Sequence, residues 1–212
     1  MKVIETKGIT YLEKFDETAE WYWGSNYTGG DLYEAEEIFN SGNLLEPNKL
    51  IFVHYPDGKV YEPIVAKANQ YFGRPAFIDG SIYILLVAFD ENVIRVYQCE
   101  KNMCSANKVI ELPLSEVKDC YNIRIDGNPV MVTRQSSDNV FQIIWPEKVE
   151  FTIGARESFW LKKEDKLYFS EWHEDPNYRE DVNVRDCHTG KLIEKIPGAI
   201  MSLPNNQMWI LR

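Results

Sequence analysis

A short stretch near residue 173 holds the densest group of side chains that can do chemistry. Glu171, His173 and Asp175 are candidate metal ligands, because carboxylates and imidazole commonly bind metal ions. Glu174 is a candidate general base. A Pro-Asn pair within the stretch favours a simpler interpretation, a solvated loop over 173–181. We adopt the loop, and expect neither a metal ion nor a cofactor.

The remaining motifs do not indicate a standard catalytic class. Ser105 to Lys108 is similar to the Ser-x-x-Lys element of serine β-lactamases. That chemistry needs the two side chains on one helix face, whereas here they lie in a hairpin turn that leads into a strand, where residues three apart face opposite sides. The glycine-rich stretch 24–31 lacks the Lys-Ser/Thr pair of a phosphate-binding loop. We therefore prefer a function without catalysis.

Composition limits the partners. The chain has 212 residues, with 33 acidic against 23 basic side chains and a net charge of −10. This charge repels phosphate backbones and anionic lipids, so we expect neither nucleic acid nor membrane partners. The longest apolar stretch, 82–89, is far shorter than the ~20 residues of a spanning helix, and residues 1–5 do not resemble a signal peptide. We expect a cytoplasmic protein with four free cysteines.

Alternating apolar and polar residues predict nine β-hairpins. Four of them share a second strand that opens with Lys and then Val or Leu, starting at residues 59, 108, 148 and 191. Five others turn at the centre of the segments 11–23, 76–84, 123–130, 159–168 and 200–209. The two kinds alternate along the chain, which indicates a repeat of about four strands.

The N-terminus carries the strand that the last repeat lacks. Residues 2–6 match the strand 108–112, so they are expected to pair with the final hairpin and close a ring. This pattern resembles a five-bladed β-propeller. The expected blades are 9–64, 75–113, 121–153, 158–196 and 199–211 with 2–6. The turn 188–193 also resembles the Asp-x-x-Thr-Gly-Lys turn of quinoprotein-type propeller blades, and no cofactor follows from it.

The sequence therefore predicts an all-β fold and a single domain over 1–212, a five-bladed propeller closed by the N-terminal strand. Another all-β sandwich or barrel is the alternative. One short helix is expected over about 31–40, within an insertion at 24–47. It opens with the Asp-x-x-Glu capping box of Asp31 and Glu34, and it ends near Gly42.

In such a ring the enlarged loops 24–47, 65–74 and 173–181 gather on one face, which becomes the expected binding surface. The first hypothesis is a non-catalytic binding module that recognises a protein or a carbohydrate-like ligand, with the oligomeric state left open. The expected ligand-binding residues are aromatic or charged and lie in these loops: Tyr27, Asp31, Tyr33, Tyr71, Arg74, His173, Tyr178 and Arg179.

Two other functions stay open. A hydrolase similar to five-bladed glycosidases would use channel carboxylates, for which Glu13, Asp79 and Asp126 are available. An acidic interaction or inhibitor protein would be drawn to a basic partner by its charge. The binding hypothesis also predicts that loop residues such as Tyr71 contribute little to stability, whereas Trp160, in a predicted hairpin, is expected to be part of the core.

Overall fold

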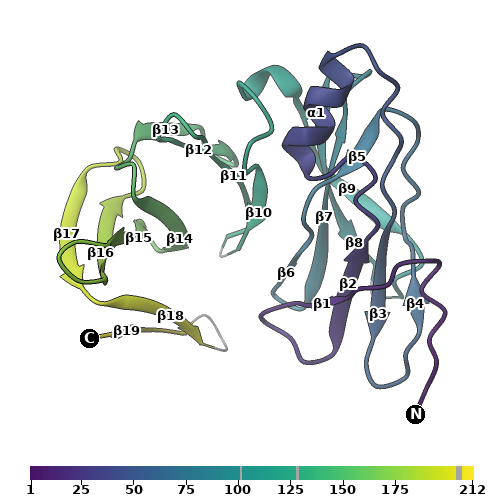
Figure 1. The fold of residues 1–212 in the computed structure, drawn as a ribbon, viewed down its shortest axis with the longest axis horizontal. Helices are drawn as coiled ribbons and strands as arrows, with labels where there is room; N and C mark the ends of the chain where they lie inside the picture. The colour runs from purple at the N-terminus through teal and green to yellow at the C-terminus, as the bar shows by residue number, and fades with distance from the viewer. Residues whose placement is uncertain (101, 128, 204–206) are drawn as a thin grey trace. The chain divides into compact units, whose positions relative to one another are not determined.

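Figure 1 shows the computed structural model, which describes residues 1–100, 102–127, 129–203 and 207–212. The chain divides into two compact units, residues 1–125 and 126–212, with the boundary inside the short strand β10 (Arg124–Asp126). Each unit has its own hydrophobic clusters. The chain, for which the sequence predicts a single domain over 1–212, is therefore described as two units, each with its own core.

The first unit contains two antiparallel sheets. One has the order β1-β2-β3-β4, and the other has the order β5-β7-β8-β9 with β6 paired to β7. The elements are β1 (Glu13–Lys14), β2 (Trp21–Ser25), α1 (Leu32–Asn40), β3 (Leu50–His54), β4 (Val60–Tyr61), β5 (Gln70–Phe72), β6 (Ala76–Ile78), β7 (Ser81–Ala88), β8 (Val93–Cys99), β9 (Ala106–Pro113) and the 3-10 helix η1 (Leu114–Glu116).

The second unit continues the same pattern with sheets β10-β11-β12-β13, β14-β15-β16-β17 and β18-β19. Its remaining strands are β11 (Met131–Gln135), β12 (Val140–Trp145), β13 (Val149–Thr152), β14 (Glu157–Lys163), β15 (Lys166–His173), β16 (Arg179–Asp186), β17 (Leu192–Pro197), β18 (Ala199–Leu203) and β19 (Gln207–Leu211). The all-β prediction is confirmed for the described residues, in which α1 is the one α-helix.

Eight of the nine predicted hairpins pair as antiparallel neighbours, and the strands of the ninth, β10 and β11, are neighbours in their sheet. Local turn chemistry explains why they could be recognised. In the β6–β7 hairpin, Asp79 and Gly80 have φ of +49° and +77°, the left-handed pair that a two-residue turn requires. Three of the nine turns include residues 101, 128 or 204–206, which lie outside the described part of the chain.

The predicted closure by the N-terminal strand is wrong. The described part of the last sheet consists of β18 and β19 alone, and residues 2–6 form no strand. Ile4 instead packs on the cluster of Ile51, Val53 and Val60, and the Lys2 ammonium donates a hydrogen bond to the Asp57 carbonyl. The apolar side chain of Ile4 is thus partly buried against β3 and β4 of the first unit.

Strand β3 shows why some strands of this sequence are continuous apolar runs. Leu50 and Phe52 face the main core of the first unit, whereas Ile51 and Val53 face a second apolar cluster. Since successive side chains point to opposite faces, a strand with both faces covered becomes a continuous apolar run. In the second unit Phe141, Phe159 and Phe169 form the centre of the core, with ring centroids 4.7 to 5.4 Å apart.

Helix α1 begins as the sequence predicts. The Asp31 carboxylate accepts a hydrogen bond of 2.9 Å from the Glu34 amide, and the Glu34 carboxylate accepts one of 2.8 Å from the Asp31 amide. Both bonds satisfy amides that the first helical turn leaves free. The helix buries Leu32 and Ala35, and it stops before Gly42, which has φ of +80°.

Within the described ranges, none of the helical segments has the length and apolar character needed to cross a membrane. All four cysteines are free. Cys99, Cys120 and Cys187 are buried and Cys104 is exposed. Burial raises the pKa of the Cys99 thiol to about 12, so this side chain behaves as a small apolar group.

Candidate functional site

A cleft of about 270 Å³ opens in the first unit. Its walls come from the segment that leads into β1 and from β2 with the residues after it. Gly24 permits the two walls to meet, because a Cβ atom there would lie 2.8 Å from the Tyr11 carbonyl oxygen. The lining residues are Gly8, Ile9, Thr10, Tyr11, Glu13, Trp23, Gly24, Ser25, Asn26 and Tyr27.

Aromatic and charged side chains meet at this cleft. Tyr11 and Tyr27 are 72% and 48% exposed, so both rings are available to a ligand. Arg74 Nη2 lies 3.2 Å from Glu13 Oε2, and the guanidinium carbon lies 5.7 Å from the centroid of the buried Trp23 ring. The cleft thus combines two exposed rings with a paired carboxylate and guanidinium.

The electrostatics around Tyr27 follow from these neighbours. Partial burial raises the pKa of the Tyr27 hydroxyl, and the negative charge of Glu13 raises it further, whereas Arg74 acts in the opposite direction. The net shift is upward, so Tyr27 keeps its proton at neutral pH and can donate a hydrogen bond. Of the predicted ligand-binding residues in the first unit, Tyr27 lines the cleft and Arg74 pairs with a residue that does.

Tyr71 lies on strand β5 rather than in a loop, and its side chain is fully buried. Its hydroxyl accepts a hydrogen bond of 2.9 Å from the Gly29 amide and donates one of 2.7 Å to the Gly30 carbonyl. Burial is the main reason why its pKa is raised. The expectation that Tyr71 is an accessible loop residue is therefore wrong, because this ring fixes the loop before α1.

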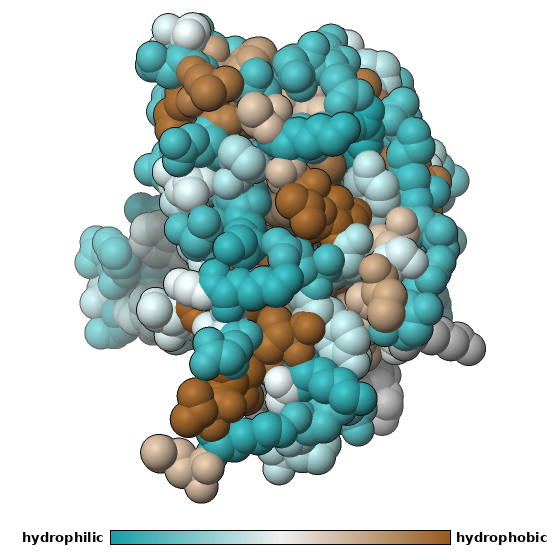
Figure 2. Space-filling model, turned by 90° about the vertical axis from the view of Figure 1, so that its right-hand side faces the viewer, coloured by the Kyte–Doolittle hydropathy of each residue, from teal (hydrophilic) through white to brown (hydrophobic). Residues whose placement is uncertain are grey.

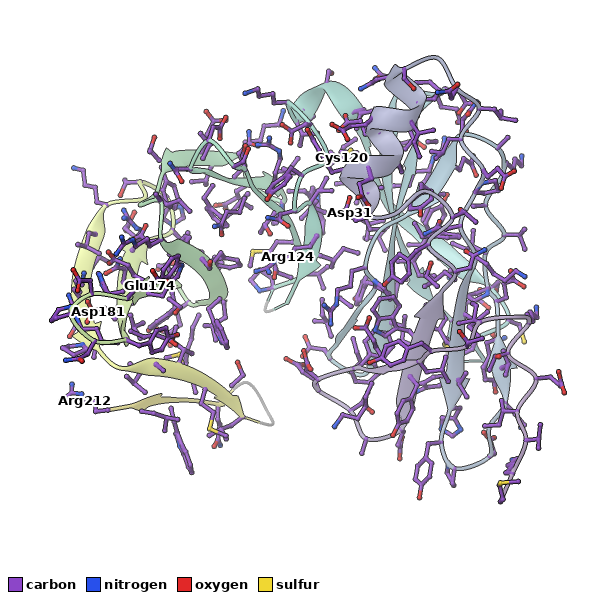
Figure 3. The ribbon with its side chains drawn as sticks, in the orientation of Figure 1. Asp31, Cys120, Arg124, Glu174, Asp181 and Arg212 are labelled. Carbon is purple, nitrogen blue, oxygen red and sulfur yellow. The ribbon has the colours of Figure 1, made fainter. Side chains whose placement is uncertain are left out.

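Asp31 and Tyr33 also have local partners. The Asp31 carboxylate caps α1, at the position marked in Figure 3. The Tyr33 ring meets Tyr121 edge-on, with centroids 5.4 Å apart, and a hydrogen bond to Glu37 raises the pKa of the Tyr33 hydroxyl. These contacts give both residues a structural role. Their predicted role in ligand binding stays a prediction.

Figure 2 shows a face of the molecule on which hydrophilic residues predominate and hydrophobic residues form small, separate groups. Large continuous apolar patches are the usual mark of a protein–protein interface. The face shown in Figure 2 does not have this character. The cleft, with its rings and charges, is the more specific candidate in the first unit.

In the second unit, one face of the sheet β14–β17 carries a polar network. The register places Glu157 beside Glu171 and Glu171 beside Asp181, so three carboxylates stand on adjacent strands. Asn183 lies two residues beyond Asp181 on β16 and pairs with Lys195 on β17. Since side chains two apart in a strand share a face, these groups project to the same side.

His173 lies at the end of β15 and not in a loop, because β15 and β16 are longer than predicted and leave 174–178 as the connection. Its Nε2 atom is 3.1 Å from Asp181 Oδ2 and 3.7 Å from Glu171 Oε1. The candidate metal ligands Glu171 and His173 are thus brought together. The third member is Asp181 rather than Asp175, since strand pairing, not sequence proximity, selects it.

Lys195 supplies the main positive charge to this group. Its ammonium lies 2.8 Å from Glu171 Oε2 and 3.1 Å from Asp181 Oδ2. Burial acts to raise the pKa of Glu171, but the hydrogen bonds from Lys195 and Asn183 outweigh it, so that pKa is lowered. The hydrogen bond to Glu171 raises the pKa of Lys195 in turn.

A second ion pair supports the network from the side of β14. Arg185 Nη2 donates to both carboxylate oxygens of the buried Glu157, each at 2.9 Å. The Asn183 amide nitrogen donates to Glu157 and, at 2.7 Å, to Glu171. The Asn183 side-chain oxygen is buried and has no hydrogen-bond partner. Alternating polar residues at 181, 183 and 185 are the sequence signal that could have located this network.

Tyr178 and Arg179, the other predicted ligand-binding residues, are exposed at the β15–β16 connection. The Tyr178 hydroxyl donates a hydrogen bond of 2.5 Å to Glu180, and an Arg179 nitrogen donates one of 3.3 Å to the Asp175 carbonyl. In the sequence, both residues come shortly before Asp181, a member of the polar network. Figure 3 marks Glu174 and Asp181 in the same part of the second unit.

Comparison with known proteins does not assign this chain to a family. No family model matches the chain, and no curated protein matches it. The solved structures that match include a dihydro-heme d1 dehydrogenase in complex with DHE (9% identity, TM-score 0.41) and a putative 6-phosphogluconolactonase from Bacteroides uniformis (12% identity, TM-score 0.42). They are aligned over 88% and 93% of this chain, which spans 38% and 61% of their lengths. Both neighbours have propeller-like folds, and at these scores they say nothing about the chemistry of this chain.

Proposed function

We propose that this protein is a non-catalytic binding module that holds a carbohydrate-like ligand in the cleft of its first unit. The main support is that two exposed tyrosine rings, Tyr11 and Tyr27, and the Glu13–Arg74 ion pair lie at one cleft. We include in this proposal that the five successive sheets are copies of one propeller-like blade repeat.

The chemistry of the cleft suits a sugar ring. Tyrosine offers an apolar face for the C–H side of a sugar and a hydroxyl for hydrogen bonding. Glu13 accepts hydrogen bonds from sugar hydroxyls, and Arg74 and the protonated Tyr27 donate them. Binding pockets of this kind combine aromatic walls with a few well-placed polar groups.

The carboxylates favour binding over hydrolysis. Glycosidases use two carboxyl groups about 5–9.5 Å apart. Among the residues that line the cleft, Glu13 is the one carboxylate, and its charge is paired with Arg74. Of the other two carboxylates considered for a hydrolase, Asp79 forms a hairpin turn and Asp126 accepts a hydrogen bond from Thr133. The cleft therefore supports recognition rather than bond cleavage.

A glycan array probed with the full chain tests the proposal. The oligosaccharide with the strongest signal is then titrated by isothermal titration calorimetry into the wild type and into Tyr27→Ala, Arg74→Ala and Glu13→Gln. Each substitution should weaken binding by about tenfold, the loss typical of an anchoring contact. Tyr178→Ala is the matched control, since it removes an exposed tyrosine that does not line the cleft.

The outcomes separate the hypotheses. Saccharide binding that weakens in the cleft variants and persists in Tyr178→Ala supports the proposal. An array without signal overturns it, and so does a saccharide whose affinity is unchanged in all three cleft variants. Hydrolysis of the bound saccharide over the course of the titration overturns the non-catalytic part.

A further inference from the structure

The polar face of β14–β17 holds three side chains in the arrangement of metal ligands. One ligand atom each from Glu171, His173 and Asp181 lies within 4.8 Å of the other two. Bonds of about 2.1 Å from a tetrahedral ion place neighbouring donors about 3.4 Å apart. The distances from His173 Nε2, 3.1 Å to Asp181 and 3.7 Å to Glu171, lie on either side of this value.

An independent observation points to the same place. Asn183 is 3% exposed, and its side-chain oxygen has no hydrogen-bond partner. The amide nitrogen of the same side chain donates to Glu171 at 2.7 Å, so the Asn183 amide group lies beside the cluster. A buried amide oxygen without a partner is costly, and either a water molecule or a bound cation satisfies it.

A positive charge already occupies part of the cluster. The Lys195 ammonium bridges Glu171 and Asp181, but its side chain is 42% exposed and belongs to β17, at the edge of the sheet. A long side chain in this position can turn toward solvent and keep its charge hydrated. Once Lys195 has turned away, the negative charges of Glu171 and Asp181 balance the charge of one divalent ion.

We propose that this cluster is a binding site for a divalent first-row transition-metal ion, with Glu171, His173 and Asp181 as ligands and the Asn183 oxygen as a fourth donor. Lys195 acts as the resident counter-ion that the metal displaces. The site lies in the second unit and is independent of the saccharide cleft.

The donor set defines the metal class. Imidazole nitrogen suits zinc and its neighbours, and carboxylate and amide oxygens suit manganese, so a mixed set of this kind favours Zn²⁺ or Mn²⁺ over Ca²⁺ and Mg²⁺. Strands fix the ligands more firmly than a loop would. Asn183 also donates a hydrogen bond to Glu157, whose carboxylate is paired with Arg185, and such outer partners orient the ligands of metal sites.

The test uses the full chain, stripped with EDTA and dialysed, in titrations with ZnCl₂ and MnCl₂ at pH 7.5 followed by calorimetry and by the shift in melting temperature. His173→Ala should weaken binding about tenfold or more, as loss of a ligand does. Lys195→Met should strengthen binding about tenfold, because the competing charge is gone. A merely structural network would not give this second result.

His188→Ala is the matched control, because this exposed histidine lies in a different group with Asp165 and Cys187. The melting temperature of each variant in EDTA shows whether it is folded. If His173→Ala does not fold, the Lys195→Met result still decides between the outcomes. Binding by the wild type that is tightened in Lys195→Met and unchanged in His188→Ala supports the site.

Three results overturn the proposal. They are a wild type that binds neither ion, a Lys195→Met variant that binds no more tightly than the wild type, and binding that is lost in His188→Ala. The last would place the metal at the group of Asp165 and Cys187 instead.

Discussion

The hydroxyl of Tyr71 accepts a hydrogen bond from the Gly29 amide, over a distance of 2.9 Å and across 42 positions of the sequence. The same hydroxyl donates to the Gly30 carbonyl, so one buried ring ties strand β5 to the turn that precedes α1. A side chain expected at a binding surface is in fact a fixed point of the first unit.

Tyr71→Phe should therefore destabilise the protein by about 1–3 kcal/mol, because it leaves the buried Gly29 amide without a partner. Tyr71→Ala should cost about 3–5 kcal/mol, since it also leaves a cavity. Urea unfolding measures both. A change below about 0.5 kcal/mol in either variant, as at an ordinary surface position, would contradict this role.

Trp160 should behave in the opposite way. Its ring is 43% exposed and its indole nitrogen donates to Ser202 at 2.8 Å, so Trp160→Ala is expected to cost about 1 kcal/mol. Phe169→Ala, which removes a fully buried ring from the Phe141 cluster, should cost about 3–5 kcal/mol. The two variants are compared in the same urea titration, and equal losses would refute the assignment.

Deletion of residues 1–6 should loosen the first unit and not the last hairpin. The deletion removes the packing of Ile4 on Ile51 and Val53. Hydrogen exchange measured by mass spectrometry should rise in peptides from β3 and β4 and stay unchanged in peptides from β19. Faster exchange confined to β19 would show that the N-terminus pairs there after all.

The Glu171–Lys195 pair should make stability depend on pH. The pKa of Glu171 is lowered from 4.5 in the folded state, so its contribution is fully present above pH 4.5 and is lost as the pH falls through the lowered folded value. Urea unfolding of the wild type and Glu171→Gln, both in EDTA, should therefore differ at pH 7 and converge in strong acid. A difference that grows on acidification would reverse the sign and reject this account.

Hairpins and the helix could be predicted from the sequence because their determinants are local. Asp79 and Gly80 adopt a turn that their own backbone preferences favour. Asp31 and Glu34 are three residues apart, which is the spacing of a capping box in any helix. Alternation along each strand fixed its pairing with the next strand, since a slip of one residue would turn every apolar side chain outward.

The packing between these elements was decided by the tertiary structure. The sequence alone showed that residues 2–6 have a strand-like pattern, but not that Ile4 packs on β3 and β4. It placed Tyr71 in a loop and Trp160 in a strand of the core, whereas the Tyr71 ring is buried and the Trp160 ring is exposed. The cluster of Glu171, His173 and Asp181 depends on the register between two strands. The alternating polar residues at 181, 183 and 185 indicate a polar face of one strand, but not which residues of the other strand stand beside it.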